Sequence, residues 1–279
     1  MFARLAKGAQ PPVRAIYGQA SHLSRTMHDI RHDPVHDELV VPVPYAQAIV
    51  TFRGGADGQE APIRTIQGPK AGSIGSRLDV DPIHNEIFTY TGSGNAVTVY
   101  AREANGDIAP VRVIKGPDTQ IKRPYGIAVD PVNDLLIVGL NSNFGTDQPL
   151  AAEDTESLEK GALLIFNRTD NGNVKPRAVI RGPKSGIIRI NQIQLYPQRR
   201  LIVADMPGDI SSMLPDGAFI GFWSYDDNGD VPPKWKIPAN DRTTLKKPLG
   251  VALNPKNKEI IISDLRNQGV LVFSVPEIF

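Results

Sequence analysis

The sequence predicts an all-β protein, a single five-bladed β-propeller of four-stranded antiparallel blades. Its 279 residues include Gly 25 and Pro 24, which favours many short strands joined by turns. One hairpin-like stretch also occurs five times, 48 to 66 residues apart, with opening prolines Pro12, Pro62, Pro110, Pro176 and Pro233. A second series keeps nearly the same steps: Pro34, Pro82, Pro131, Pro197 and Pro255. Repeats of this length that consist of short strands are typical of propeller blades.

The third repeat shows the four expected strands of a blade, at 126–130, 135–140, 162–167 and 176–182. The first two are almost continuously apolar, as expected where both faces of a sheet are covered. The fourth opens with a proline, which has no N–H to donate, and it therefore suits an outer edge. In three repeats this strand also carries an arginine: Arg14, Arg64 and Arg112.

The repeated hairpin is therefore the outer half of each blade, and its Asn-Gly or Asp-Gly pair supplies the positive φ of a tight turn. The predicted blades cover approximately 27–69, 76–117, 124–183, 190–240 and 248–279 plus 1–20. The chain begins with the end of one repeat and stops before the end of another. We therefore expect residues 9–18 to complete the last blade and close the ring.

Composition excludes several classes of protein. No stretch approaches the ~18 apolar residues of a membrane span, and residues 1–12 lack the apolar segment of a signal peptide. The absence of Cys excludes disulfides, thiolate catalysis and cysteine-bound zinc, but leaves the compartment open. A cytoplasmic location is expected if Met1 is the native start, and export if the chain is a trimmed mature form.

The stretch EIIISDLRNQGVLVFS, residues 259–274, resembles the signature of NHL-type propellers. The whole chain resembles, as architecture, the bacterial NHL, streptogramin-lyase-like and gluconolactonase-like propeller proteins. Asp264 lies in this stretch and Asp205 is its counterpart one repeat earlier. The resemblance implies either a binding scaffold or, as an alternative, a metal-dependent hydrolase with its site at the channel mouth.

Two features favour the binding scaffold. Insertions at 141–161 and 205–218 follow the second strand of adjacent blades, on the side that also carries the connectors between blades; we call this side the connector face. Long loops on a rigid scaffold often carry function. The connectors hold ten basic and two acidic residues, a local charge of +8 in a chain of net charge +1. Such a field suits an acidic protein or a small anionic ligand. Nucleic acid is not expected, because no aromatic residues interleave with the charge.

The candidate binding residues are Arg25, His28, Lys70, Arg77, Lys122, Arg123, Tyr125, Asn141, Asn191, Arg242, Lys246 and Lys247. No catalytic residue and no cofactor is expected under this hypothesis. Under the hydrolase alternative, Asn191, Asp205 and Asp264 would bind a divalent cation. A lectin is a third alternative, although the aromatic residues do not recur in register. His36 and His84 are predicted to be structural, since both lie in a repeated turn.

Overall fold

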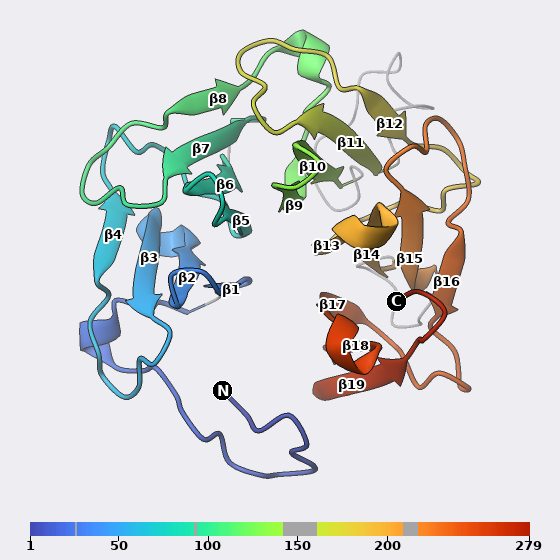
Figure 1. The fold of residues 1–279 in the computed structure, drawn as a ribbon, viewed down its shortest axis with the longest axis horizontal. Coiled ribbons are helices and arrows are strands. Elements are labelled where there is room, and N and C mark those ends of the chain that lie inside the picture. Colours follow the sequence, from blue (N-terminus) through green and yellow to red (C-terminus); the bar gives the residue numbers. More distant parts are fainter. Residues whose placement is uncertain (26, 92–93, 142–160, 209–216) are drawn as a thin grey trace, which may run out of the picture. The chain divides into compact units, whose positions relative to one another are not determined.

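The computed structural model describes the chain except residues 26, 92–93, 142–160 and 209–216, and it is all-β (Figure 1). The described residues contain nineteen strands, five short 3-10 segments and no α-helix. The chain divides into two compact units. Unit 1 comprises 1–94 and 98–112, and unit 2 comprises 95–97 and 113–279. None of the described helices is long and apolar enough to cross a membrane.

The first two sheets each have four antiparallel strands in chain order. The first contains β1 (Arg31–Asp33), β2 (Glu38–Val43), β3 (Ala48–Arg53) and β4 (Arg64–Gln67). The second contains β5 (Leu78–Asp81), β6 (Glu86–Tyr90), β7 (Val97–Ala101) and β8 (Arg112–Ile114). Between β2 and β3 lies a 3-10 segment, η2 (Pro44–Ala46).

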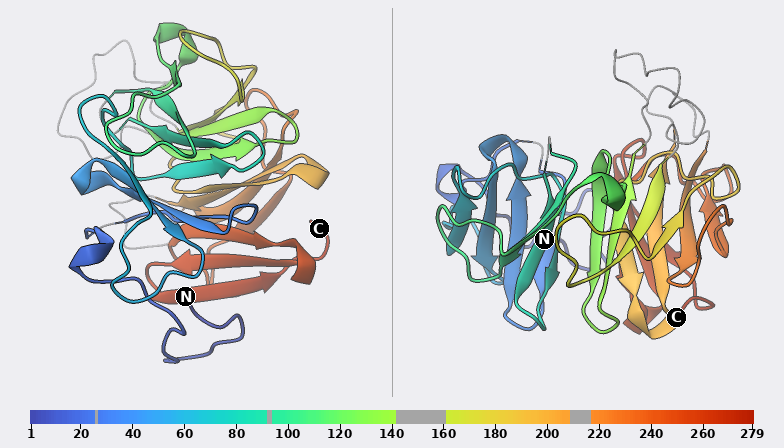
Figure 2. Two further views of the ribbon diagram at one scale, coloured as in Figure 1. Left: turned by 60° about the vertical axis from the view of Figure 1, so that its left-hand side comes forward. Right: turned by 90° about the horizontal axis from the view of Figure 1, so that it is seen from above.

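Three further sheets belong to unit 2 (Figures 1 and 2). One contains β9 (Pro124–Asp130), β10 (Leu135–Leu140), β11 (Ala162–Asn167) and β12 (Ala178–Ile180). The next contains β13 (Ile193–Tyr196), β14 (Leu201–Pro207), β15 (Ala218–Ser224) and β16 (Trp235–Pro238). The last contains β17 (Pro248–Asn254), β18 (Glu259–Asp264) and β19 (Gly269–Ser274). Four predicted strands of the third repeat are thus confirmed as β9 to β12.

The last sheet has three strands, and among the described residues none pairs with the outer side of β19. Residues 9–18 form no β-strand. Their one β-bridge joins Ile16 to Gly58, within unit 1. The expected closure by this segment is therefore not a feature of the last sheet in this structure. Residues 9–18 belong to unit 1 and the last sheet belongs to unit 2, so the pairing of this segment with that sheet stays a prediction.

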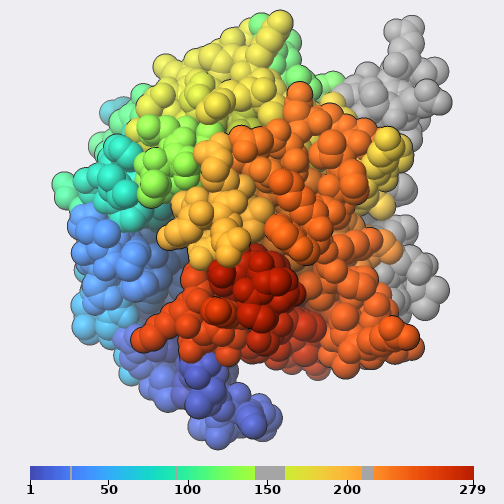
Figure 3. Space-filling model, turned by 45° about the vertical axis from the view of Figure 1, so that its right-hand side comes forward, coloured from blue at the N-terminus to red at the C-terminus, as the bar shows by residue number. Residues whose placement is uncertain are grey.

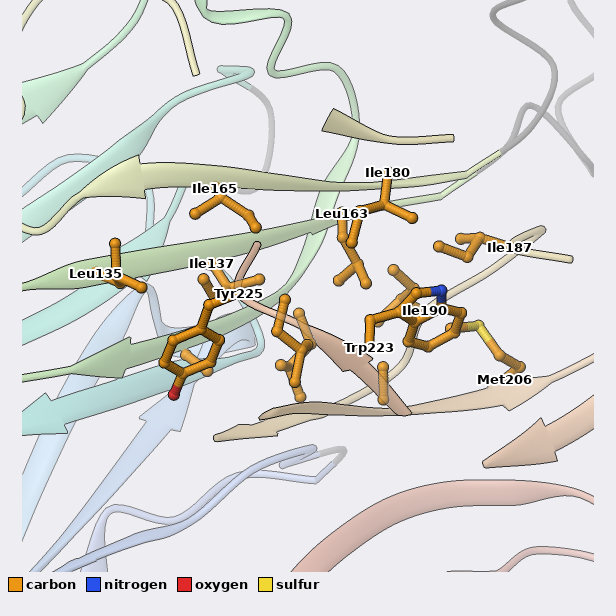
Figure 4. Packing of buried hydrophobic residues seen from close by; sticks show 14 of the residues in the cluster. Leu135, Ile137, Leu163, Ile165, Ile180, Ile187, Ile190, Met206, Trp223 and Tyr225 are labelled. Carbon is orange, nitrogen blue, oxygen red and sulfur yellow. The ribbon is translucent and has the colours of Figure 1, made fainter. Parts of the chain in front are cut away.

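Apolar side chains fill both faces of the central strands of unit 2. In β10 and β11 every residue but the last of β11 is buried. Leu163, Ile190 and Trp223 belong to one buried cluster that joins the third sheet to the fourth (Figure 4). A second cluster joins the fourth sheet to the last and includes the C-terminal Val275 and Ile278. The C-terminal residues pack on the surface of this part of unit 2 (Figure 3).

The outer strands β4, β8 and β12 each contact the turn of the following blade, and we call this contact the clasp. Ile66 of β4 forms a parallel bridge with Gly106. In the same way, Ile114 pairs with Gly172 and Ile180 pairs with Gly229. The Asn of the turn adds a side-chain bond: Asn105 Oδ1 accepts from the Thr65 N–H at 2.9 Å. The predicted positive φ is confirmed at the turn glycines, for example 86° at Gly106. The hairpin therefore both reverses the chain and holds its neighbour.

Candidate functional site

The connector face carries most of the predicted binding residues at its surface. Those that are exposed are Arg25, His28, Lys70, Lys122, Arg123, Arg242 and Lys246. Tyr125, Asn141 and Lys247 are partly buried. The described connectors therefore present a predominantly basic surface, with Asp118 and Asp241 as exposed acidic neighbours. Most of the first insertion and more than half of the second, at 142–160 and 209–216, lie outside the described residues.

Arg77 and Asn191 differ from the expectation, because both are buried. Arg77 is 2% exposed, and its guanidinium donates to the carbonyl oxygen of His28. The amide of Asn191 donates to the carbonyl oxygen of Leu249. Both side chains donate to backbone carbonyl groups, one before β1 and one in β17. A buried polar group needs such a hydrogen bond to offset the cost of its desolvation. They position the connector face and are not part of its surface.

In unit 1, Arg25 and Tyr45 form an exposed pair on the connector face. The Arg25 guanidinium carbon lies 5.4 Å from the centroid of the Tyr45 ring, within the range of a cation–π contact. Tyr45 is 66% exposed although it is a large aromatic residue. Met27 and Ile30, just after Arg25 in the chain, are exposed as well. We call Arg25, Met27, Ile30 and Tyr45 the Tyr45 patch.

The backbone on both sides of this patch is held in place. Tyr45 lies in η2, where the Ala46 carbonyl accepts from the Gln67 side chain at 2.7 Å and Gln47 Oε1 accepts from the Ile74 N–H at 3.0 Å. On the other side, the Asp29 carboxylate accepts from the Leu78 N–H at 3.3 Å. Tyr45 therefore stands on hydrogen-bonded backbone, which lowers the entropic cost of presenting its side chain to a partner.

Asp29 also belongs to a buried ion-pair network. Arg31 is buried, and its guanidinium lies 3.7 Å from Asp29 and 3.3 Å from Asp79. Burial acts to lower the pKa of Arg31, but the two carboxylates outweigh burial and the pKa is raised. Arg31 therefore stays charged, and its role is to join β1 to β5.

In unit 2, the structure brings Tyr125 together with Arg189, another connector residue. The Arg189 guanidinium carbon lies 5.8 Å from the centroid of the Tyr125 ring. Asn141, which follows β10, accepts from the Ile190 N–H at 2.9 Å and so fixes the connector next to Arg189. Asn141 is therefore a loop anchor, and Tyr125 with Arg189 repeats the chemistry of Arg25 with Tyr45.

The carboxylates proposed for a metal act as caps of backbone N–H groups. Asp264 Oδ2 accepts from the N–H groups of Lys246 and Lys247, at 2.7 and 2.9 Å. Asp205 Oδ1 accepts from the N–H groups of Asn191 and Gln192, at 3.1 and 2.5 Å. Within the described part of the chain, no group of three His, Cys, Asp or Glu residues is arranged to hold a metal ion.

The repeated histidines lie in turns, as expected. His36 Nδ1 lies 2.7 Å from Asp33 Oδ2, and His84 Nδ1 lies 2.7 Å from Asp81 Oδ2. Both carboxylates are buried and also accept N–H bonds from their own turns. These pairs close the turns between the first two strands of two blades.

The sequence did not identify Tyr45, Met27 or Ile30 as site residues. The available signal was the Pro-Tyr pair at 44–45, directly after an apolar strand, where an aromatic residue has no core to enter. Arg189 appeared only as one charge among ten. The count of basic residues could not show which of their side chains reach the surface.

Comparison with solved structures shows the fold. The chain is similar to one in the crystal structure of the nidogen/laminin complex, with a TM-score of 0.60 and 14% sequence identity, over 88% of this chain and 74% of the other. This similarity and the five sheets make the chain a five-bladed β-propeller. No protein-family model matches the sequence, and the search of curated proteins found no match. The comparisons thus support a β-propeller and no narrower family.

Proposed function

We propose that this β-propeller is a non-catalytic protein-binding module that uses its connector face. The observation that carries the proposal is the Tyr45 patch, an exposed tyrosine with an arginine over its ring and two exposed apolar residues that follow this arginine in the chain. Tyrosine, arginine and methionine are enriched in protein interfaces and at the residues that contribute most to binding. Tyr45 sits on hydrogen-bonded backbone, which reduces the entropy lost on binding.

The proposed partner is a protein segment that combines carboxylates with apolar side chains. Arg25 and Lys70 supply positive charge in unit 1, whereas Tyr45, Met27 and Ile30 supply apolar area. Charges around an interface steer the encounter and raise the association rate more than they increase affinity. An acidic partner with an apolar centre therefore fits both parts of the surface.

Two similarities support the proposal at a coarser level. The solved neighbour comes from the nidogen/laminin complex, so a chain of this fold takes part in an assembly of proteins. The stretch at 259–274 also resembles NHL-type propellers, and we retain that resemblance as part of the proposal. Asp264 caps a connector in that stretch, which suits a scaffold.

Selection from a random peptide library displayed on phage would test the proposal. We expect enrichment of sequences that join Asp or Glu to apolar residues. The selected peptides should lose affinity for Tyr45→Ser and for Arg25→Glu but not for Val35→Ser. Val35 is an equally exposed apolar residue in a turn at the other end of the same blade. If Val35→Ser weakened binding as much as Tyr45→Ser, or if no peptide were enriched, the connector face would not be the site.

A further inference from the structure

Arg181, directly after β12 in unit 2, has a guanidinium group with an unanswered donor. Its side chain is partly buried, and its Nε–H is shielded from solvent without an acceptor among the described residues. Burial lowers the pKa of Arg181, and no described carboxylate opposes this effect. A shielded donor on a charged group destabilises a fold unless something accepts its hydrogen bond. Arg181 is therefore a candidate for binding an external group.

Other arginines that are withdrawn from solvent do have acceptors. The guanidinium groups of the fully buried ones donate to oxygen atoms of the protein: these are Arg31, Arg77, Arg102 and Arg168. Arg64 and Arg112 share a shielded Nε with Arg181. However, their terminal nitrogens pair with carboxylates, those of Glu38 and Glu86. Within the described residues, Arg181 therefore departs from the pattern.

The equivalent position of the first blade shows what a structural side chain does at this place. Gln67 follows Ile66 in β4 as Arg181 follows Ile180 of β12, and both isoleucines form clasps. The Gln67 amide donates to the Ala46 carbonyl oxygen at 2.7 Å, which holds β4 to the loop between β2 and β3. A neutral side chain therefore suffices for a structural bond here, whereas Arg181 adds a charge.

The connector after β12, residues 181–192, contains three basic residues and no acidic one. Besides the arginine at its start, it carries Lys184, which is exposed, and Arg189, which is partly buried. Asp230 and Asp205 touch the backbone of this connector, where both accept hydrogen bonds from N–H groups. The connector is therefore locally basic, and these two carboxylates are engaged by its backbone.

The connector also lies in a fixed position within unit 2. Ile187 and Ile190 are buried in the cluster that contains Trp223 (Figure 4). Gly161, directly before β11, allows the connector to approach, because a Cβ there would come within 2.7 Å of the Ile188 carbonyl oxygen. A ligand of this connector would therefore meet a backbone that is already packed, which reduces the entropy lost on binding.

We propose that Arg181 binds a phosphate group, and that Lys184 and Arg189 supply further positive charge to this site. A guanidinium group can donate two parallel hydrogen bonds to a phosphate, and a phosphate oxygen would give the shielded Nε–H its acceptor. A phosphate monoester carries about 1.5–2 negative charges near neutral pH, which suits several cations better than a single carboxylate does. The group could be a free phosphate ion or part of a small organic molecule. The inference does not rest on the proposed protein-binding function.

Thermal unfolding of the full-length protein, with and without inorganic phosphate at constant ionic strength, tests the site. Arg181→Gln copies the residue that the first blade has at this place. Without phosphate this variant should melt about 2–4 °C above the wild type, because it removes an uncompensated charge. Phosphate should raise the melting temperature of the wild type and leave that of Arg181→Gln unchanged. Arg177→Gln, at an exposed arginine before β12, is the control and should respond to phosphate as the wild type does.

A lower melting temperature of Arg181→Gln without phosphate would show that Arg181 has a structural partner, and it would overturn the proposal. A wild type that does not respond to phosphate, or that responds equally to succinate, would overturn it as well. Calorimetric titration with phosphate provides a second measurement. Arg181→Lys keeps the charge but loses the paired donors, so it should bind phosphate more weakly than the wild type and more tightly than Arg181→Gln. Tighter binding of glycerol phosphate than of inorganic phosphate would assign the group to an organic molecule, and the reverse order would assign it to the free ion.

Discussion

The hydroxyl of Tyr225 donates a 2.8 Å hydrogen bond to Oδ2 of Asp130, which links the fourth sheet to the third. Both residues are buried, and the same carboxylate accepts from the N–H groups of Val132 and Asn133. Arg200 lies over the Tyr225 ring, 5.4 Å from its centroid. One side chain therefore holds a turn of the neighbouring blade from within the core.

Removing this hydroxyl should destabilise unit 2. Tyr225→Phe leaves a buried carboxylate oxygen with fewer donors, a change that costs about 1–3 kcal/mol. The measurement is urea denaturation followed by tryptophan fluorescence. Tyr17→Phe, at an exposed tyrosine, is the control and should change the free energy of unfolding very little. Equal effects of the two substitutions would contradict a structural role for the bond.

Alkaline pH should weaken the same link. Burial raises the pKa of Tyr225 above its ordinary value, and the nearby Asp130 carboxylate raises this pKa further. A group whose pKa is raised by folding contributes fully below its unfolded pKa, here about 10. Its contribution falls as the pH rises beyond that value. The free energy of unfolding should therefore decline above about pH 10, and less steeply in Tyr225→Phe. An identical pH profile for the two proteins would exclude this origin.

Glu38 should contribute much more to stability than the surface acid Glu60. Glu38 is buried and accepts from Arg64 and, at 2.8 Å, from Arg102. Glu38→Gln removes the charge that both guanidinium groups need, and breaking a buried pair typically costs about 3–5 kcal/mol. Glu60 pairs with Arg53 in solvent, where screening leaves little net stabilisation. Thermal unfolding of Glu38→Gln and Glu60→Gln should separate the two, and similar melting temperatures would refute the difference.

Asp264 should behave as a cap and not as a metal ligand. Besides Lys246 and Lys247, it accepts from the N–H groups of Arg266 and Asn267, both at 3.0 Å. Asp264→Asn keeps one acceptor oxygen and should cost about 1–3 kcal/mol. Excess chelator should leave the melting temperature of both proteins unchanged. A divalent ion that is present in the wild type and lost in Asp264→Asn would instead support the hydrolase alternative.

Association with an acidic partner should depend on salt. The double substitution Lys246→Glu with Lys247→Glu reverses two charges of the connector face. The association rate of the selected acidic peptides should therefore fall by a larger factor than their dissociation rate rises. The effect should shrink as ionic strength rises, because exposed charges are screened beyond about 8–10 Å near physiological salt. Stopped-flow kinetics at low and high salt provide the measurement. Lys234→Glu with Lys256→Glu, at exposed lysines on the other end of the blades, is the control.

Equal slowing by both pairs would place the site elsewhere. Arg64 cannot serve as the control, although it lies on an outer strand. Its guanidinium is paired with Glu38, so reversing its charge would damage the blade itself.

The strands were predictable because the repeat shows each kind of strand several times, and the turn glycines are confirmed by their positive φ. Side-chain direction was not predictable in the same way. In the sequence, Arg77 looks like one more charged residue of a connector. In the structure its side chain is buried and donates to the His28 carbonyl oxygen. The clasp was also unforeseen, because a turn sequence shows how a chain reverses but not which neighbouring strand it contacts. Tyr45 was missed because its pattern does not recur between blades.

The clasp also bears on the chemical ageing of the protein. An Asn-Gly pair deamidates when the glycine nitrogen attacks the asparagine side chain, and this chain carries such pairs at Asn105, Asn171 and Asn228. The glycine N–H groups that follow them donate to Thr65, Val113 and Val179, at 2.7, 2.8 and 2.7 Å. The asparagine oxygens in turn accept from the N–H groups of the same three residues. Nucleophile and target are thus both engaged by the neighbouring blade, so these sites should lose ammonia far more slowly than the same dipeptides in an unfolded chain.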